Sequence, residues 1–432
     1  MKTKTSKLFG ALAFALIFAL SCMNTAFAAG TPIYGTESAP AQAAITKILQ
    51  MPIGTNTPKA DFIFEVKAIS ADGADATPSN MPPIGNITLS SANTMNGTTT
   101  GNIKRIILES ADIFKNVTFS HAGTYVYEIT EIEKTNPAID NNTDHESLTY
   151  SPAKYELTVL VMNKKAPATG TYIYAIGDVI IIEDNDEQKK GDKVDPTPLD
   201  PDVSGDYSKM IFTNTYVKTN GPGDPENPEP EDATLSVSKK VTGDLGNLEL
   251  YFDYSMTITV PSLVAEPKAY KAYVVDTDDT FVSAADLVDL NNATVAGTDK
   301  NGNAYIEFNN KAAVTFSLKH GQKLAFIDTP VGTSYNVEEA KAAGYIPNVS
   351  VVYDGGMPTV TTNTLENIDF GVIGKLVGEK TNSADFINER KDVSITGLDF
   401  SSLPFVGMIA LALGVAALLF VSKARKAKNN YN

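Results

Sequence analysis

The sequence predicts an all-β protein made of two tandem, antiparallel β-sandwiches. Short runs rich in Val, Ile, Tyr, Phe and Thr recur along the chain between Gly, Asn, Asp and Pro, a pattern typical of strands and turns. No convincing long amphipathic helix interrupts them. A segment dense in Pro, Gly and acidic residues divides the 432-residue chain into two parts, each near the usual size of one domain.

Residues 40–217 and residues 234–391 are each expected to form one sandwich of immunoglobulin-like character. The strands expected in the first half include residues 62–66, 125–129, 155–161 and 179–182. Those expected in the second half include residues 250–260, 271–275, 304–308, 323–327 and 349–353. Residues 218–233, KTNGPGDPENPEPEDA, predict an extended linker that does not pack, and the polar stretch 183–209 predicts a long loop.

Both ends of the sequence predict export and anchoring. Residues 1–28 combine lysines, an apolar run and a small-x-small site, as a secretory signal peptide does. The one cysteine, Cys22, lies inside this segment, and a passive role is favoured there over a lipid anchor. Residues 403–421 are uncharged and long enough to span a bilayer as one helix, and the basic tail that follows is expected to stay in the cytoplasm. The exported chain then has no disulfides, so another source of stability is expected.

Composition argues against several function classes. The net charge of −16 and the absence of a basic patch disfavour nucleic-acid binding. The three histidines, His121, His145 and His320, show no ligand spacing, and no phosphate loop or serine elbow is present. Acidic clusters at 183–187 and 276–279 match no EF-hand, so solvated loops are favoured over calcium sites. We therefore expect no enzyme, no cofactor and no metal.

Polar residues recur at positions that the strand pattern would bury. Side chains alternate between the two faces of a strand, so Lys47 shares a side with Ile45 and Leu49. By the same rule Glu131 and Asn214 lie on the apolar sides of their strands. The second half repeats the order with Lys239, Glu339 and Asn388. Two Lys…Glu…Asn sets in one chain indicate an internal duplication of one chemical site.

These residue types suit an intramolecular crosslink. Burial favours the neutral amine of a lysine, which is a nucleophile, and likewise favours the neutral acid of a carboxyl group. The lysine amine can attack the asparagine side-chain amide while the glutamate polarises the carbonyl and shuttles protons, leaving an isopeptide bond and ammonia. The alternative is that Lys47 and Lys239 are ordinary strand residues whose ammonium groups reach solvent. Six residues in the same order in both halves favour the crosslink.

The motifs around these residues point to a known family. The stretches LSVSKKVTG, GTYVYEITE, VGTSYNVEEA, IFTNT and FINER resemble the streptococcal-type pilin isopeptide-linkage domain, the repeated module of Gram-positive sortase-assembled pilus backbone proteins. Glu131 and Glu339 match the last residue of its Y-x-x-x-E strand, and Asn214 and Asn388 its Phe-x-Asn end. Lys47 fits less tightly because Lys59 and Lys67 lie nearby. Lys240 competes with Lys239 but is out of phase with Leu235 and Val237.

The resemblance implies a sorting signal within residues 393–428. Thr396 and Gly397 keep the Thr-Gly pair without the usual proline, while residues 403–407, LPFVG, keep Leu-Pro without Thr. Cleavage at the second site would leave an apolar segment that is short for a stop-transfer helix. Thr396 is therefore preferred as the residue whose carbonyl forms a thioester with the sortase cysteine.

The resemblance also implies the partners: a sortase, neighbouring pilin subunits in a covalent homopolymer, peptidoglycan and a host-surface ligand. An acceptor lysine is expected near the end of the first domain. Lys209 is the best placed because it faces away from Asn214, and Lys189, Lys190 and Lys193 compete with it. A wall- or membrane-anchored adhesin or stalk that uses the same modules without polymerising is the alternative function.

Overall fold

The computed structural model describes residues 40–92, 96–139, 145–165, 172–183, 193–199, 207–220, 227–265, 269–288 and 295–391. Within these ranges the regular secondary structure is almost entirely β, with one short helix, α2 (Ala284–Val288), and one 3-10 turn, η1 (Pro230–Asp232). The all-β prediction is confirmed. The predicted signal peptide, the sorting signal 393–428 and the predicted membrane helix 403–421 lie outside the described residues.

The N-terminal half contains two sheets. The five-stranded sheet has the order β5 (Asn96–Thr100), β6 (Ile103–Glu109), β1 (Thr46–Pro52), β12 (Ile211–Lys218), β8 (Glu146–Thr149). The facing sheet has the order β11 (Lys193–Val194), β10 (Tyr172–Glu183), β9 (Lys154–Lys165), β7 (Gly123–Asn136), β2 (Asp61–Ala71), β3 (Ala74–Asp75), and β4 (Ile87–Ser90) also pairs with β2.

The C-terminal half repeats the two-sheet plan. Its eight-stranded sheet has the order β16 (Val295–Thr298), β17 (Ala304–Phe308), β15 (Tyr270–Val275), β19 (Lys323–Phe326), β13 (Leu235–Thr242), β24 (Ser383–Arg390), β21 (Tyr345–Val352), β22 (Thr359–Thr361). Its second sheet has the order β18 (Ala313–Leu318), β14 (Phe252–Thr259), β20 (Ser334–Glu339), β23 (Phe370–Leu376).

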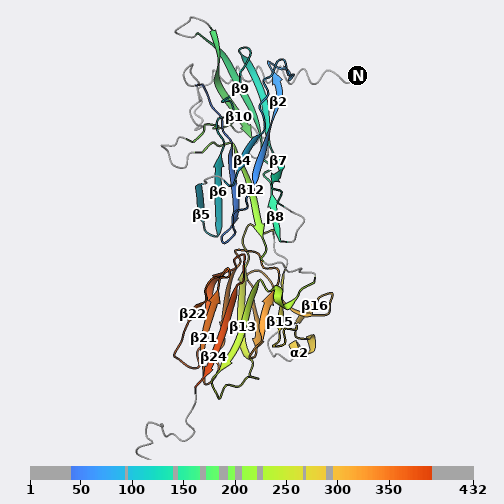
Figure 1. Cartoon of the computed structure of the whole chain (residues 1–432), viewed down its shortest axis with the longest axis vertical. Coiled ribbons are helices and arrows are strands. Elements are labelled where there is room, and N and C mark those ends of the chain that lie inside the picture. The colour runs from blue at the N-terminus through green and yellow to red at the C-terminus, as the bar shows by residue number, and fades with distance from the viewer. Residues whose placement is uncertain are drawn as a thin grey trace, which may run out of the picture.

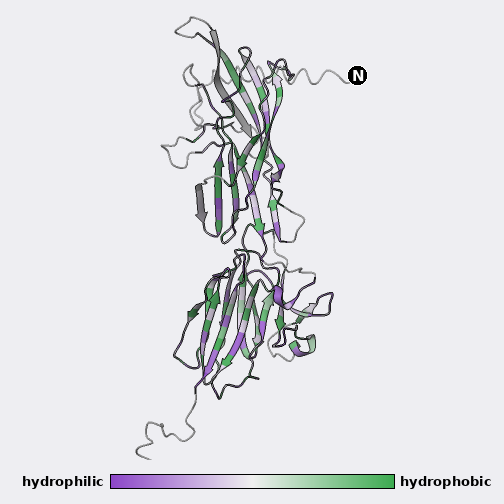
Figure 2. Cartoon of the chain, in the orientation of Figure 1, coloured by the Kyte–Doolittle hydropathy of each residue, from purple (hydrophilic) through white to green (hydrophobic). Residues whose placement is uncertain are grey.

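Each half has its own hydrophobic core between its sheets. Apolar and polar residues alternate along most strands, as Figure 2 shows by the change of colour along the arrows. The N-terminal core includes Phe62, Phe64 and Tyr125, and the C-terminal core includes Tyr254, Phe316 and Phe386. The period of two in the sequence therefore decides which side of each strand is buried.

The first and last strands of each half are parallel neighbours. In the N-terminal half β1 pairs with β12, and Lys47 is aligned with Phe212. In the C-terminal half β13 pairs with β24, and Lys239 is aligned with Phe386. The Phe of each Phe-x-Asn motif therefore lies beside the lysine, and the asparagine lies two residues further along the last strand, on the same face.

The two halves lie end to end along the long axis of the molecule, and β12 ends at their junction (Figure 1). Glu379 of the C-terminal half accepts hydrogen bonds from the backbone N–H and the side-chain amide of Asn56, at 2.7 and 3.0 Å, and from Lys218 at 3.1 Å. Asn220 is 4 % exposed and its amide donates to the carbonyl oxygens of Thr234 and Lys380.

This packing departs from the expectation of an unpacked linker at the described parts of the segment, residues 218–220 and 227–233. Lys218 is the last residue of β12, and Asn220 and Pro230 are buried. The expectation failed because Asn220 satisfies backbone carbonyl groups of the second half, an interaction that no local composition rule detects. Residues 221–226 lie outside the described ranges.

Candidate functional site

The structure brings Lys47, Glu131 and Asn214 together in the N-terminal core. Nζ of Lys47 donates to both carboxylate oxygens of Glu131, each at 2.7 Å. Nδ2 of Asn214 donates to Oε1 of Glu131 at 2.8 Å. Lys47 and Asn214 are fully buried and Glu131 is 8 % exposed. One carboxyl group therefore contacts both the amine and the amide.

The second set forms the same cluster. Nζ of Lys239 donates to Oε2 of Glu339 at 2.7 Å, and Nδ2 of Asn388 donates to Oε1 of the same carboxyl group. The three residues are at most 2 % exposed. Removing a lysine amine, a carboxylate and an amide from water costs folding free energy. The presence of this cluster in both halves therefore indicates a function other than packing alone.

The sandwich architecture assembles each cluster from both sheets. Lysine and asparagine come from adjacent parallel strands of one sheet, β1 with β12 and β13 with β24. Glutamate comes from the facing sheet, where Glu131 on β7 pairs with Phe64 of β2 and Glu339 on β20 pairs with Tyr254 of β14. Inward alternation on both sheets then makes the three side chains meet in the middle of the core.

Each lysine amine lies against an aromatic ring, and burial lowers its pKa. Nζ of Lys47 lies 4.9 Å from the ring centroid of Phe62, and Nζ of Lys239 lies 3.7 Å from that of Phe252. Burial lowers the pKa of Lys47 to about 8, although Glu131 acts in the opposite direction. Burial likewise lowers the pKa of Lys239 to about 8 against the effect of Glu339. Both amines are therefore neutral far more often than a solvated lysine.

The two clusters differ at their edges. Tyr254 donates its hydroxyl to Oε2 of Glu339 at 3.0 Å, and the corresponding position in the N-terminal half is Phe64, which has no hydroxyl. Burial, followed by the charge of Glu339, raises the pKa of Tyr254, so this hydroxyl stays protonated. Sequence reasoning missed Tyr254, although comparing FIFEV with LYFDYSM offers the signal.

The competing lysines lie outside the clusters. Lys59, Lys67 and Lys240 are exposed, while Lys47 and Lys239 are buried. Lys209 is exposed next to β12, and its backbone N–H donates to the carbonyl oxygen of Asp195.

Several predicted site residues are not among those that the structure describes. Lys189, Lys190, Thr396, Gly397 and residues 403–407 lie outside the described residues. Lys193 is the first residue of β11. Within the described ranges, no helix has the length and apolar character needed to cross a membrane.

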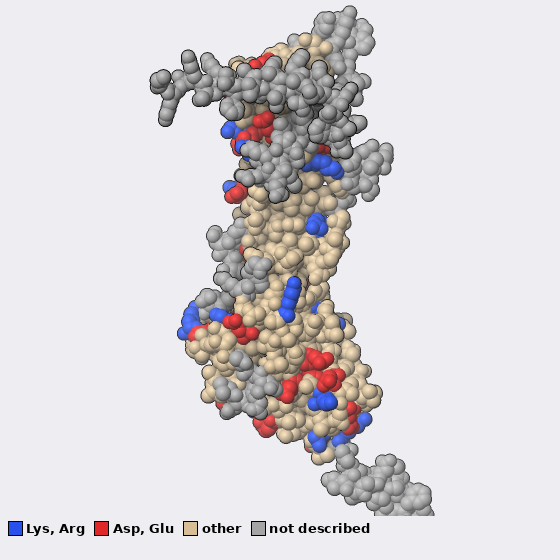
Figure 3. All heavy atoms as spheres, turned by 180° about the vertical axis from the view of Figure 1, so that it is seen from behind, with Lys and Arg blue, Asp and Glu red and all other residues tan. Residues whose placement is uncertain are grey.

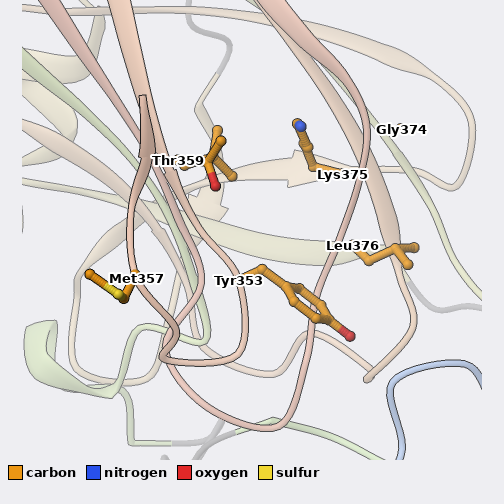
Figure 4. Close-up of a pocket in the computed structure, with 7 residues that line it drawn as sticks. Tyr353, Met357, Thr359, Gly374, Lys375 and Leu376 are labelled. Carbon is orange, nitrogen blue, oxygen red and sulfur yellow. The ribbon is translucent and has the colours of Figure 1, made fainter. Parts of the chain in front are cut away.

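A surface cavity of about 370 Å³ lies in the C-terminal half, and none of its lining residues belongs to the clusters (Figure 4). It is lined by Val351, Tyr353, Met357, Thr359, Gly374, Lys375 and Leu376. Lys375 is the one charged residue in this lining, and Tyr353 and Thr359 contribute hydroxyl groups. Over the part of the chain that the structure describes, no group of three His, Cys, Asp or Glu side chains could hold a metal ion. Charged side chains of both signs are interspersed on the face shown in Figure 3.

The chain matches one family model over its C-terminal half and is similar to solved structures over most of its length. A family model, "Domain of unknown function (DUF7601)", matches residues 233–390, the C-terminal half. No curated protein matches the chain significantly. Among solved structures, the chain is similar to the major pilin of Streptococcus pyogenes at 20 % identity, with 81 % of this chain and 99 % of that chain covered and a TM-score of 0.30.

Two further solved structures are similar. The major pilin of another Streptococcus pyogenes serotype shows 19 % identity and a TM-score of 0.30, with 81 % of this chain and 98 % of that chain covered. A pilus-presented adhesin shows 17 % identity and a TM-score of 0.23, with 55 % of this chain and 36 % of that chain covered.

Proposed function

We propose that this chain is a structural cell-surface protein in which each domain forms one autocatalytic isopeptide bond, between Lys47 and Asn214 and between Lys239 and Asn388. The observation that carries the proposal is the pair of buried Lys–Glu–Asn clusters, in which the same carboxyl group contacts the nucleophile and the leaving group. The equal strand register of the two clusters supports it.

The reaction uses the chain's own groups. Neutral Nζ of Lys47 attacks Cγ of Asn214, the Nζ–Cγ bond forms, and the Cγ–Nδ2 bond breaks. Nζ loses one proton and Nδ2 gains one, so ammonia leaves. Glu131 lies within hydrogen-bond distance of both nitrogens and carries the proton between them. Glu339 has the same role between Lys239 and Asn388.

The bonds would suit a protein that must resist load. Each joins the first strand of a domain to the last, and the two halves lie end to end with their long axes continued through the junction (Figure 1). Tension that enters one end of a domain would pass through the crosslink and would not separate β1 from β12 or β13 from β24. Such a chain gains, without cysteines, the stability that disulfides give other exported proteins.

We further propose that the chain is the backbone subunit of a sortase-polymerised pilus. The sequence support is the signal peptide 1–28, the Thr396-Gly397 pair before the apolar segment 403–421, and the basic tail. Sortase would join Thr396 of one subunit to Lys209 of the next, and the end of the polymer would be attached to peptidoglycan. The exposed position of Lys209 beside β12 supports this assignment.

Intact mass spectrometry of the expressed residues 29–391 tests the crosslinks. The mass should fall short of the sequence mass by one ammonia for each domain, and Glu131→Ala together with Glu339→Ala should restore the full mass. A wild-type chain of full mass would overturn the proposal.

Co-expression of the full chain with its cognate sortase tests polymerisation. Ladders that resist boiling in detergent are expected, and deletion of Thr396 and Gly397 should abolish them. Peptide mapping should place the junction on Lys209. A junction on Lys189, Lys190 or Lys193 would replace only that assignment, and wall-attached monomer alone would favour the adhesin.

A further inference from the structure

The carbonyl oxygens of the two crosslinking asparagines have different surroundings. Oδ1 of Asn214 accepts a hydrogen bond from the backbone N–H of Ser151 at 2.8 Å. Oδ1 of Asn388 is buried and has no hydrogen-bond partner among the described residues. Together with the Tyr254 hydroxyl, which contacts Glu339 alone, this contact distinguishes two sites that share their lysine, glutamate and asparagine.

The fold explains the difference. Ser151 lies between β8 and β9, just past the end of the strand that pairs with β12, so its N–H is free of the sheet ladder and points at the asparagine. In the C-terminal half β21 stays paired with β24 past Asn388, as far as Tyr345 opposite Arg390, so the backbone beside Asn388 still belongs to the sheet ladder, and the residue directly opposite Asn388 is Pro347. Proline has no N–H, so the backbone at that position has nothing to donate.

The chemistry makes this contact consequential. When the lysine amine attacks Cγ, the carbonyl π electrons move to Oδ1, and the oxygen carries negative charge until the Cγ–Nδ2 bond breaks. A backbone N–H already aimed at that oxygen forms a stronger hydrogen bond as the charge develops, and it needs no rearrangement during the reaction. The site is buried, so the effect is not diluted by water.

We propose that the backbone N–H of Ser151 is the oxyanion donor for formation of the Lys47–Asn214 bond, and that no described residue supplies such a donor for the Lys239–Asn388 bond. The inference rests on the proposed isopeptide function and adds a group that contacts a reacting atom. Removal of one oxyanion donor typically slows an acyl-transfer reaction by roughly 100-fold or more. The bond in the N-terminal domain should slow by that amount when the N–H is removed.

The experiment compares two substitutions at one position. Ser151→Pro removes the N–H, while Ser151→Ala keeps it and removes only the hydroxyl. Chains of residues 29–391 recovered in unfolded, unreacted form are refolded by dilution, quenched at intervals and digested, and each crosslinked peptide is quantified by mass spectrometry. Ser151→Pro should slow the Lys47–Asn214 crosslink roughly 100-fold. Ser151→Ala should leave its rate unchanged, and the Lys239–Asn388 crosslink in the same molecules should form at the same rate in all three chains.

Folding and chemistry are separated by a background that cannot react. In Glu131→Gln chains, Ser151→Pro should leave the near-ultraviolet circular dichroism unchanged. If the proline variant does not fold, the amide before residue 151 is replaced by an ester in a ligated chain, which removes the N–H and keeps the side chain. An equal rate of the Lys47–Asn214 crosslink with and without the N–H would overturn the role of Ser151 alone. Absence of both crosslinks from the wild type would overturn the proposed function and this inference with it.

Discussion

Asn214→Ala isolates the contribution of a crosslink to stability. The substitution removes the electrophile but leaves the 2.7 Å contact between Lys47 and Glu131, so no buried charge loses its partner. The bond would close a loop of well over a hundred residues between β1 and β12, for which the chain-entropy model gives about 5 kcal/mol. For a domain of this size, about 5 kcal/mol corresponds to a fall in melting temperature of roughly 10–20 °C.

Packing must be separated from the crosslink, because Asn214→Ala also leaves the N–H of Ser151 without its acceptor, at a cost of about 1–3 kcal/mol. The same substitution is therefore made in a Glu131→Gln background, where no bond forms. Differential scanning calorimetry of the four chains gives a double-mutant cycle. Asn214→Ala should cost about 5 kcal/mol more in the wild-type background than in the Glu131→Gln background. Equal costs in the two backgrounds would refute the reasoning, because the crosslink would then contribute nothing.

Three further predictions follow from the clusters and the junction. Tyr254→Phe gives the C-terminal cluster the same ring that Phe64 provides in the N-terminal cluster, and it removes the hydrogen bond to Glu339. The Lys239–Asn388 crosslink should then form roughly tenfold more slowly, which the quenched-refolding assay measures. Because burial lowers the pKa of Lys47 to about 8, its neutral fraction falls about tenfold for each pH unit below that value, so crosslinking should slow steeply from pH 8 to pH 6; a flat profile would contradict the neutral-amine mechanism. Burial by itself would raise the pKa of Glu379, but hydrogen bonds from Asn56 and the charge of Lys218 hold this pKa below its usual value. The Glu379 carboxylate should therefore hold the two halves together at neutral pH and release them only in acid, as the pH falls through the folded-state pKa. Glu379→Gln should broaden the distribution of distances between spin labels on the two halves at neutral pH, and an unchanged distribution would show that other contacts hold the junction.

Sequence periodicity determined which side chains enter the cores. A period of two placed Lys47, Glu131 and Asn214 on apolar faces, and the structure has all three buried. The same rule separated Lys239 from its neighbour Lys240, which is exposed. These conclusions needed no partner strand, because the side of a strand on which a residue lies is a local property of the backbone.

Tertiary structure decided what those side chains contact. The register that aligns Lys47 with Phe212, and so offers it the amide of Asn214, depends on the pairing of strands at opposite ends of a domain. Residues 218–233 have the composition of a free linker, so the sequence does not predict that Asn220 packs into the C-terminal half. Sequence composition reports local preferences, whereas a buried amide is positioned by whichever carbonyl groups the fold brings near it.

The backbone N–H of Ser151 is a contact that sequence patterns do not predict. A backbone N–H has no residue-specific signature, and its direction follows from where β8 stops pairing with β12. The residue types of the chain therefore determined the chemistry available to each cluster, the lysine amine, the carboxyl group and the amide. Only the three-dimensional path of the backbone decided that Oδ1 of Asn214 has a hydrogen-bond donor and that Oδ1 of Asn388 has none among the described residues. The reason is that such a contact joins two segments whose separation in the sequence carries no information about their distance in space.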